Sequence, residues 1–244
     1  MGTRRSPRHP SDPNVADAAA LIGHPARAAV LVALLDGRAL PAAELARRGG
    51  TSPQAASAHL RRLVDGGLLA VRASGRHRLY QLATREVAQA IEALLVIAAP
   101  PRIAALSQSL AMERLREARL CYDHLAGRLG VAVTDALVAR GVVRAEATEF
   151  RVTPRGERFF DGLGIDVTAL RGRRRPLARA CMDWTERRPH LAGSLGMALQ
   201  ECFLAHDWIV RRREDRAVRL TERGLRAIGR VFGVRAPHAA DRSA

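Results

Sequence analysis

The chain has 244 residues, which is long for a single small domain and predicts two domains. Hydrophobic residues make up 48% of it and aromatic residues only 4%, so the core must be mainly aliphatic. Lysine is absent, the formal net charge is +16, and this balance favours a polyanionic partner. Three cysteines argue against a disulfide scaffold and for a reducing cytoplasm, and no apolar run reaches membrane-spanning length.

The first hundred residues begin with a basic segment and continue into helical patterns. Residues 1–13 combine arginines and prolines without an apolar segment, which predicts a disordered basic arm. Asn14 is a capping residue for a short helix that ends near Leu21. The segment HPARAAVLVALLDG that follows predicts the first helix of a larger unit.

The segment from Leu40 to Leu82 has the order of a winged helix-turn-helix, a fold that places one short helix in the major groove of DNA. Apolar residues at helical spacing predict two helices around the Gly49-Gly50 turn, and Thr51 or Ser52 caps the second one. The following LLAVRASGRHRLYQL alternates about a Ser74-Gly75 turn and predicts a β-hairpin wing.

Candidate DNA contacts lie on the second helix and on the wing. Gln54 and Ser57 carry amide and hydroxyl groups suited to base edges, whereas nearby cations suit phosphate. A charged wing is usually only a solvated face, but its place beside a recognition helix favours contact with phosphate or the minor groove. The full candidate set is Ser52, Gln54, Ser57, His59, Arg61, Arg62, Arg72, Arg76, His77 and Arg78.

This segment resembles the ArsR/SmtB family of bacterial transcriptional repressors. In TSPQAASAHLRRLVDGGLL the matching recognition-helix residues are Ser52, Gln54, Ser57, His59 and Leu60. Upstream, LIGHPARAAVLVALLDG resembles the family's first helix, including the His-Pro followed by Arg27. The resemblance covers about Val15 to Pro100 and implies a homodimer that represses its own operon and releases DNA when an effector binds.

The resemblance also implies two places for a metal sensor, and neither holds the residues required. Family members often use cysteines in the helix before the recognition helix, or Asp/His pairs on the dimer helix. Here ELARRGG has no cysteine, and VAQAIEALLVI has neither histidine nor aspartate. Zinc or arsenic sensing at these two places is therefore set aside.

After the wing, TREVAQAIEALLVIAAP predicts a helix with the apolar stripe Val87, Ile91, Leu94 and Leu95. Because an apolar stripe is unfavourable in water, we expect it to pack against either a dimer partner or the chain's own second domain. A further helix is predicted from Arg102. The predicted divisions are a disordered arm 1–13, a winged helix-turn-helix DNA-binding and dimerisation domain 14–100, a connecting helix 101–118, an effector domain 119–236 and a disordered tail 237–244.

The second domain contains an internal repeat. HLAGRLGVAVTDALVARGVV is echoed by HLAGSLGMALQECFLAHDWIV, and FRVTPRGERFFDGLGI by VRLTERGLRAIGRVFGV. Each copy predicts a helix, a glycine turn, a second helix, a strand and a closing helix, but its recognition position lacks a cationic face. We therefore expect two degenerate winged-helix-like units, and a fold class that is mainly α with small β-hairpin wings.

Candidates for an effector site lie in this domain. Cys121 and His124 are three apart, and Cys202 and His206 four apart, spacings that place two ligands on one helix face. If the copies pack together, Cys121 and Cys181 would meet as a soft-metal site or a redox disulfide. The alternative is that the cysteines are small buried hydrophobes. The candidate set is Cys121, Tyr122, His124, Cys181, Asp183, Trp184 and His190.

A small organic effector in a cleft between the copies is the other option. Tyr122, Trp184, Phe203 and Trp208 are four of the nine aromatic residues and concentrate in this region. Aromatic residues at such sparse usage are either the centre of a core or the walls of a pocket.

The leading hypothesis is a cytoplasmic, homodimeric repressor that binds a palindromic double-stranded operator and is tuned by a soft metal or an organic effector. A sequence-tolerant nucleoid-type or promoter-scaffolding protein without ligand is the alternative. An enzyme with Cys121 as nucleophile and His124 as base lacks an orienting third group, and no hydrolase, P-loop or dinucleotide motif is present. We therefore expect no catalysis and no membrane partner.

Overall fold

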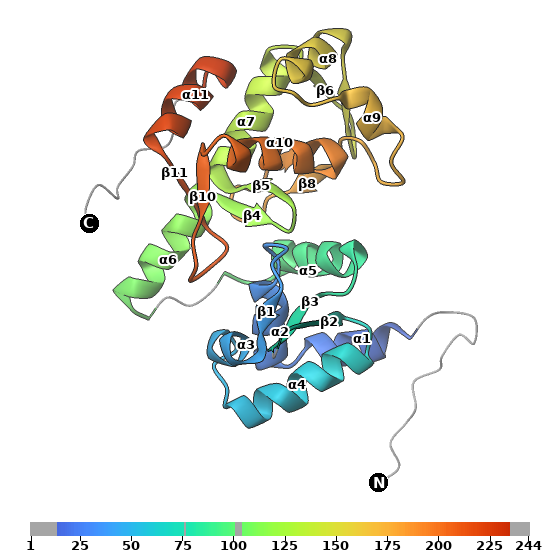
Figure 1. Cartoon of the computed structure of the whole chain (residues 1–244), viewed down its shortest axis with the longest axis vertical. Coiled ribbons are helices and arrows are strands. Elements are labelled where there is room, and N and C mark those ends of the chain that lie inside the picture. Colours follow the sequence, from blue (N-terminus) through green and yellow to red (C-terminus); the bar gives the residue numbers. More distant parts are fainter. Residues whose placement is uncertain (1–13, 76, 101–103, 235–244) are drawn as a thin grey trace. The chain divides into compact units, whose positions relative to one another are not determined.

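The computed structural model describes residues 14–75, 77–100 and 104–234, whose helices and strands are shown in Figure 1. They form two compact units, residues 14–34 with 39–84, and residues 35–38 with 85–234. The predicted arm 1–13, the tail 237–244 and Arg76 lie outside the described residues. The division falls after Thr84, so the helix that we grouped with the first domain clusters with the second unit.

The first unit is a winged helix-turn-helix, as predicted. Its elements are α1 (Val15–Ile22), α2 (Pro25–Ala33), β1 (Leu40–Pro41), α3 (Ala42–Arg48), α4 (Pro53–Asp65), β2 (Leu69–Ser74) and β3 (His77–Leu82). In its antiparallel sheet, β3 lies between β1 and β2. Helices α2, α3 and α4 pack on one another around a core that includes Val30, Leu31, Leu45, Leu60 and Leu63.

Side-chain caps define the helix ends of this unit. The Ser52 hydroxyl accepts a hydrogen bond from the Ala55 N–H at 3.2 Å, which starts α4 with Pro53 in its first turn. Buried Arg27 donates to the carbonyl oxygens of Leu21 at 2.5 Å and Ala20 at 2.7 Å. These two bonds satisfy the last carbonyl groups of α1 and hold it against α2.

The wing turn lies one residue later than predicted. Ser74 pairs with His77, so the two-residue loop consists of residues 75 and 76 rather than Ser74 and Gly75. Gly75 has a φ of +57°, the conformation that the first residue of a type I′ loop requires.

No single helix in the described part of the chain has the length and hydropathy to cross a membrane. Helices α1 and α2 meet that measure only when taken together, and the chain bends by 87° between them.

The second unit contains the remaining elements. They are α5 (Arg85–Ile97), α6 (Leu106–Glu117), β4 (Arg119–Cys121), β5 (His124–Ala126), α7 (Gly127–Ala139), β6 (Val143–Ala145), β7 (Phe150–Val152), α8 (Pro154–Asp161), α9 (Val167–Arg171), β8 (Ala180–Met182), β9 (Pro189–Leu191), α10 (Gly193–Ala205), β10 (Ile209–Arg211), β11 (Val218–Leu220) and α11 (Glu222–Phe232). Helix α6 begins at Leu106, four residues after the predicted start.

Two copies of a hairpin–helix–hairpin–helix motif make up most of this unit. The leading hairpins β4–β5 and β8–β9 replace the helix that we predicted at the start of each copy, so that prediction is wrong. Tyr122 has a φ of +59° in the two-residue turn of β4–β5, a conformation that a right-handed helix excludes. The three-residue spacing of Cys121 and His124 therefore reflects strand pairing across a hairpin and not a helix face.

Each leading hairpin packs on the opposite copy. Strand β4 bridges to β11 through Arg119 and Ala217, and β8 bridges to β7 through Arg179 and Glu149. Strand β5 packs on α10, and β9 packs on α7. The two copies therefore share one continuous hydrophobic core, built largely from Leu, Val, Ile and Phe side chains.

Candidate DNA interface and buried cysteine–histidine cluster

Helix α4 is amphipathic, with one face buried in the core and the other exposed to solvent. Ala56, Leu60 and Leu63 are buried in the core of the first unit. Facing solvent are Ser52, Gln54, Ser57, Arg61 and Arg62. The Ser57 hydroxyl donates to the Pro53 carbonyl oxygen at 3.0 Å, which leaves its lone pairs free to accept a hydrogen bond. This face offers amide, hydroxyl and guanidinium groups, the chemistry that reads and grips DNA.

Arginines on α4 and on the wing carry uncompensated charge. Within the described residues, no ion pair involves Arg61, Arg62, Arg72 or Arg78, and all four are exposed. A groove of about 530 Å³ lies beside them, lined by Pro41, Ala42, Ala43, Ser57, Arg61, Val64, Asp65, Arg78 and Tyr80. The polar lining of the groove, which includes residues of α4 and of the wing, therefore consists of two cations, two hydroxyls and one carboxylate.

In helix α3, by contrast with α4 and the wing, the arginines are paired with a carboxylate. Glu44 accepts hydrogen bonds from Arg47 at 2.6 Å and from Arg48 at 2.7 Å. These two bonds lower the pKa of Glu44 to about 2. The positive charge of α3 is partly neutralised within its own helix, so the cations open to a polyanion gather on α4 and the wing.

His59 has a packing partner within the first unit. Its ring lies 4.4 Å, centroid to centroid, from the ring of His24, the residue that caps α2. Partial burial and the charges of His24, Arg27 and Arg62 lower the pKa of His59. A phosphate contact by His59 stays a prediction, as does one by Arg76 or the His77 side chain, which lie outside the described residues.

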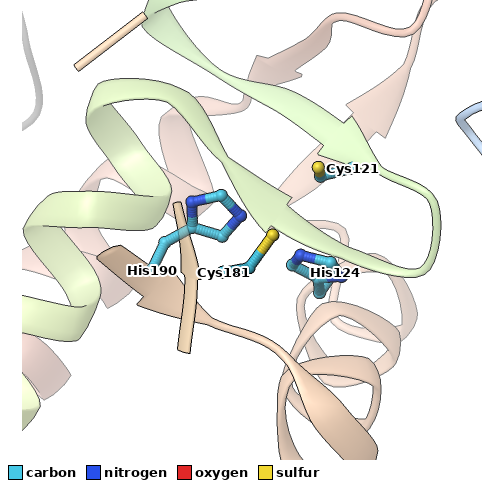
Figure 2. Close-up of side chains that lie close together, drawn as sticks. All are labelled: Cys121, His124, Cys181 and His190. Atoms are coloured by element: carbon cyan, nitrogen blue, oxygen red, sulfur yellow. The ribbon is translucent and has the colours of Figure 1, made fainter. Parts of the chain in front are cut away.

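The second unit brings four of the predicted effector residues together. The ligand atoms of Cys121, His124, Cys181 and His190 all lie within 4.8 Å of one another, and all four side chains are buried. Figure 2 shows the Cys181 sulfur between the two imidazole rings, with Cys121 facing the same space. Cys121 pairs with His124 across one leading hairpin, and Cys181 with His190 across the other. Each copy therefore contributes one thiol and one imidazole.

Glycines in α7 and α10 make room for the two imidazoles. A Cβ atom at Gly130 would lie 3.8 Å from the Cβ of His190, and one at Gly196 would lie 3.2 Å from the Cβ of His124. The same added atoms would lie 2.5 Å from a carbonyl oxygen in the leading hairpin of their own copy. Only glycine lets the hairpins and helices approach this closely.

Glu92 of α5 closes one side of the cluster. The Cys121 thiol donates to Glu92 Oε1 at 2.7 Å, and the Cys181 thiol to Glu92 Oε2 at 3.6 Å. The carboxylate is 5% exposed, and its nearest cation, the Arg179 guanidinium, is 4.0 Å away. The pKa of Cys121 is raised well above its usual value by the contact between Cys121 and Cys181, by burial and by the negative charge of Glu92.

Each imidazole turns its Nδ1 atom toward an aspartate. The Asp123 carboxylate lies 3.3 Å from His124 Nδ1, and the Asp183 carboxylate lies 3.3 Å from His190 Nδ1. The Nε2 atoms of both rings are buried without a hydrogen-bond partner among the described residues. Burial alone would lower the pKa of His124, but the nearby Asp123 carboxylate and the neighbouring Cys121 raise that pKa to about 10.

Asp183 anchors the cluster to the rest of the unit. Its fully buried carboxylate accepts hydrogen bonds from Arg119 at 2.8 Å, from the Gly127 N–H at 2.7 Å and from the Thr185 N–H at 2.9 Å. Although burial opposes ionisation, contact with His190 and the Arg119 charge hold the pKa of Asp183 well below its usual range.

The other predicted effector residues have structural surroundings. Trp184 lies under the Arg119 guanidinium at 4.7 Å, and the half-buried Tyr122 occupies the β4–β5 turn. Phe203 and Trp208 pack on each other in the core at 5.1 Å. Of the two alternatives for these aromatics, Phe203 and Trp208 therefore follow the first and belong to the core. The Cys202 Sγ atom lies 3.6 Å from His206 Nδ1, as their spacing predicted, but this pair is outside the cluster of four.

Sequence reasoning missed Glu92. It is the one carboxylate within VAQAIEALLVI, one position from the buried Ile91. A lone charge inside an apolar helical pattern was the available signal, but the pattern does not identify its partners, because the thiols come from hairpins far away in the sequence.

Three comparisons with known proteins bear on the chain. Residues 22–72 match the helix-turn-helix domain family. Over 224 residues the chain is 42% identical to the uncharacterized HTH-type transcriptional regulator YdfF of Bacillus subtilis, covering 92% of this chain and 99% of that relative.

Solved structures resemble a smaller part of the chain. The transcriptional repressor BigR of Xylella fastidiosa is 25% identical and covers 36% of this chain and 88% of its own, with a TM-score of 0.33. The cadmium metal-sensor CMTR of Mycobacterium tuberculosis is 32% identical and covers 36% of this chain and 97% of its own, with a TM-score of 0.30.

Proposed function

Because the chain belongs to the family of helix-turn-helix transcriptional regulators, we propose that it is a cytoplasmic homodimeric repressor of the ArsR/SmtB type that binds a palindromic operator. Helix α4 enters the major groove of each half-site, and the β2–β3 wing grips the flanking phosphates. The observation that carries this proposal is the row of exposed, unpaired arginines that joins α4 to the wing around the Ser57 groove. The second unit is the effector-responsive part, and no catalytic role is assigned to it.

The experiment separates base reading from phosphate binding. An operator is selected from a random duplex library with the full-length protein, and affinities for operator and scrambled duplex are measured by fluorescence anisotropy over a salt series. Gln54→Ala with Ser57→Ala removes the preference for operator but retains most of the nonspecific affinity, because base contacts specify and phosphate contacts position.

The wing variant gives the complementary result. Arg72→Ala with Arg78→Ala weakens binding to both duplexes and lowers the salt slope by about 3.6 units for the dimer, roughly 0.9 for each of the four lost phosphate contacts. Arg155→Ala with Arg158→Ala removes the same charge from α8 of the second unit and serves as the control, with an unchanged slope. Equal slopes for the two double variants would contradict the proposed interface.

The same protein and duplexes test the homodimer and the alternative of a sequence-tolerant DNA-binding protein. Sedimentation of the operator complex should show two chains for each palindromic duplex. A wild-type protein that binds operator and scrambled duplex equally would favour the sequence-tolerant nucleoid-type alternative, for which the net charge of +16 is the supporting observation.

A further inference from the structure

We infer that Cys121, His124, Cys181 and His190 form a tetrahedral binding site for Zn²⁺ or a cation of the same class. Two thiolates and two imidazoles are a ligand set that zinc prefers in structural sites. The four ligand atoms already lie within 4.8 Å of one another. Zinc bonds of about 2.0–2.3 Å require rotamer adjustments on the order of 1 Å to close the set around an ion.

The histidines are oriented as metal ligands. Each Nδ1 lies 3.3 Å from an aspartate oxygen, so we assign Nε2 as the ring nitrogen that binds the ion. In the described part of the chain neither Nε2 has a hydrogen-bond partner, although both are buried. Buried nitrogen atoms without a partner are costly, and a bound cation satisfies both. Carboxylates behind metal-bound imidazoles are the usual outer support of such sites.

Charge balance also suits the buried position. Binding one divalent cation displaces the two thiol protons and the proton on the ligating nitrogen of a charged imidazole, all of which leave to solvent, and the two thiolates then neutralise the charge of the ion. The ion is held by one cysteine and one histidine from each copy, and it therefore crosslinks the two leading hairpins.

Glu92 couples the ion to α5. In this structure both thiols donate hydrogen bonds to its carboxylate. Metal-bound thiolates have no proton to donate, so the buried carboxylate loses both of these donors and keeps its ion pair with Arg179 at 4.0 Å. Occupancy of the site therefore disfavours the present docking of α5. Only Ala83 and Thr84 separate α5 from strand β3 of the wing, so a change in α5 is passed along the chain to the DNA-binding unit.

The metal site is tested on the full-length, reduced protein with Co²⁺ as a spectroscopic probe for Zn²⁺. We expect one ion per chain, with the strong visible bands of tetrahedral cobalt and thiolate-to-cobalt charge transfer in the ultraviolet. Zn²⁺ should displace the Co²⁺ and abolish both signals. The wild-type titration needs no variant, and an absence of thiolate charge transfer there overturns the site.

Variants then assign the ligands. Cys121→Ser should weaken Co²⁺ binding by at least tenfold and remove part of the charge transfer, whereas Cys202→Ser, the matched control outside the cluster, should leave the spectrum unchanged. Circular dichroism verifies that each variant is folded. Equal spectra for the two cysteine variants contradict the assignment.

The regulatory part of this inference rests on the proposed function. Zn²⁺ should change the operator affinity of the wild type by about 5- to 150-fold, the usual range for coupled sites. Glu92→Gln should retain Co²⁺ binding but lose this response, because an amide can accept from a thiol and donate to a thiolate. A wild-type change below twofold, or an unaltered response in Glu92→Gln, overturns the coupling.

The two proposals fail in distinguishable ways. A protein that shows the cobalt spectrum but binds no operator retains the metal site and refutes the DNA proposal. A protein that binds operator but shows no thiolate–cobalt band does the reverse.

Discussion

Asp183 is the side chain whose loss should most weaken the second unit. Its carboxylate is fully buried and accepts from Arg119, from the Gly127 N–H and from both polar groups of Thr185. Asp183→Asn preserves the shape but replaces one acceptor with an NH₂ group and leaves the buried Arg119 guanidinium uncompensated. Removing one partner of a buried ion pair costs about 3–5 kcal/mol of unfolding free energy, and we expect a loss in this range.

The internal repeat supplies a matched control. Asp123 holds the equivalent place in the first copy, but it is 21% exposed and pairs with Arg175 at 2.7 Å near the surface. Ion pairs in such positions contribute about 1 kcal/mol or less, so Asp123→Asn should cost far less than Asp183→Asn.

Urea unfolding followed by tryptophan fluorescence measures both variants. Trp184 and Trp208 are the only tryptophans, and both belong to the second unit, so the signal reports that unit alone. The buffer contains EDTA, so that a bound metal contributes to neither value. A loss for Asp183→Asn no greater than that for Asp123→Asn would refute the reasoning.

Three further predictions concern packing and surface charge. Gly224→Ala should cost about 1–3 kcal/mol or more in thermal or urea unfolding, because its Cβ would lie 1.9 Å from the Trp208 carbonyl oxygen. Gly229→Ala in the same helix has nothing closer than 3.8 Å and should be neutral or stabilising by about 0.5–1 kcal/mol, so equal costs would contradict the packing argument. Leu60→Ala should destabilise the first unit by about 2–5 kcal/mol, measured by circular dichroism, and a loss under 1 kcal/mol would place it outside the core. Ionised Glu44, whose pKa is lowered to about 2, should stabilise the first unit above about pH 4.5 and lose this contribution as the pH falls toward 2. Because Glu44 is 25% and Arg47 62% exposed, solvent screens the interaction, and Glu44→Gln should cost less than about 1 kcal/mol at pH 7 and nothing near pH 2. A constant difference across that range would exclude ionisation as the cause.

The first unit could be predicted closely because its signals are local. Ser52 caps α4 and Gly75 permits the wing turn, and each acts within a few residues of itself. The wing turn was misplaced by one residue because Ser74 and Gly75 both suit turns, and strand pairing decides between them.

The cluster was only half predictable, because its geometry depends on pairing between distant segments. Matching positions in the repeat placed Cys121 and Cys181 together, and the structure has them in one cluster. The pairing of Cys121 with His124 was assigned to a helix by a spacing that a tight hairpin satisfies equally well, since residues i and i+3 face each other across a two-residue turn. Glu92 was missed because periodicity identifies a buried face but not what covers it.

The exchange of leading hairpins between the copies has a consequence for synthesis on the ribosome. The winged unit uses contacts within residues 14–34 and 39–84, so it can fold once residue 84 has emerged, before residues 35–38 have met the second unit. Strand β4, by contrast, takes its neighbour from β11, where contacting residues such as Leu120 and Arg216 are 96 positions apart. The first copy must therefore wait, with its leading hairpin uncovered, until nearly the whole chain has been made. During that interval Cys121 and His124 are open to solvent while the DNA-binding unit is already complete.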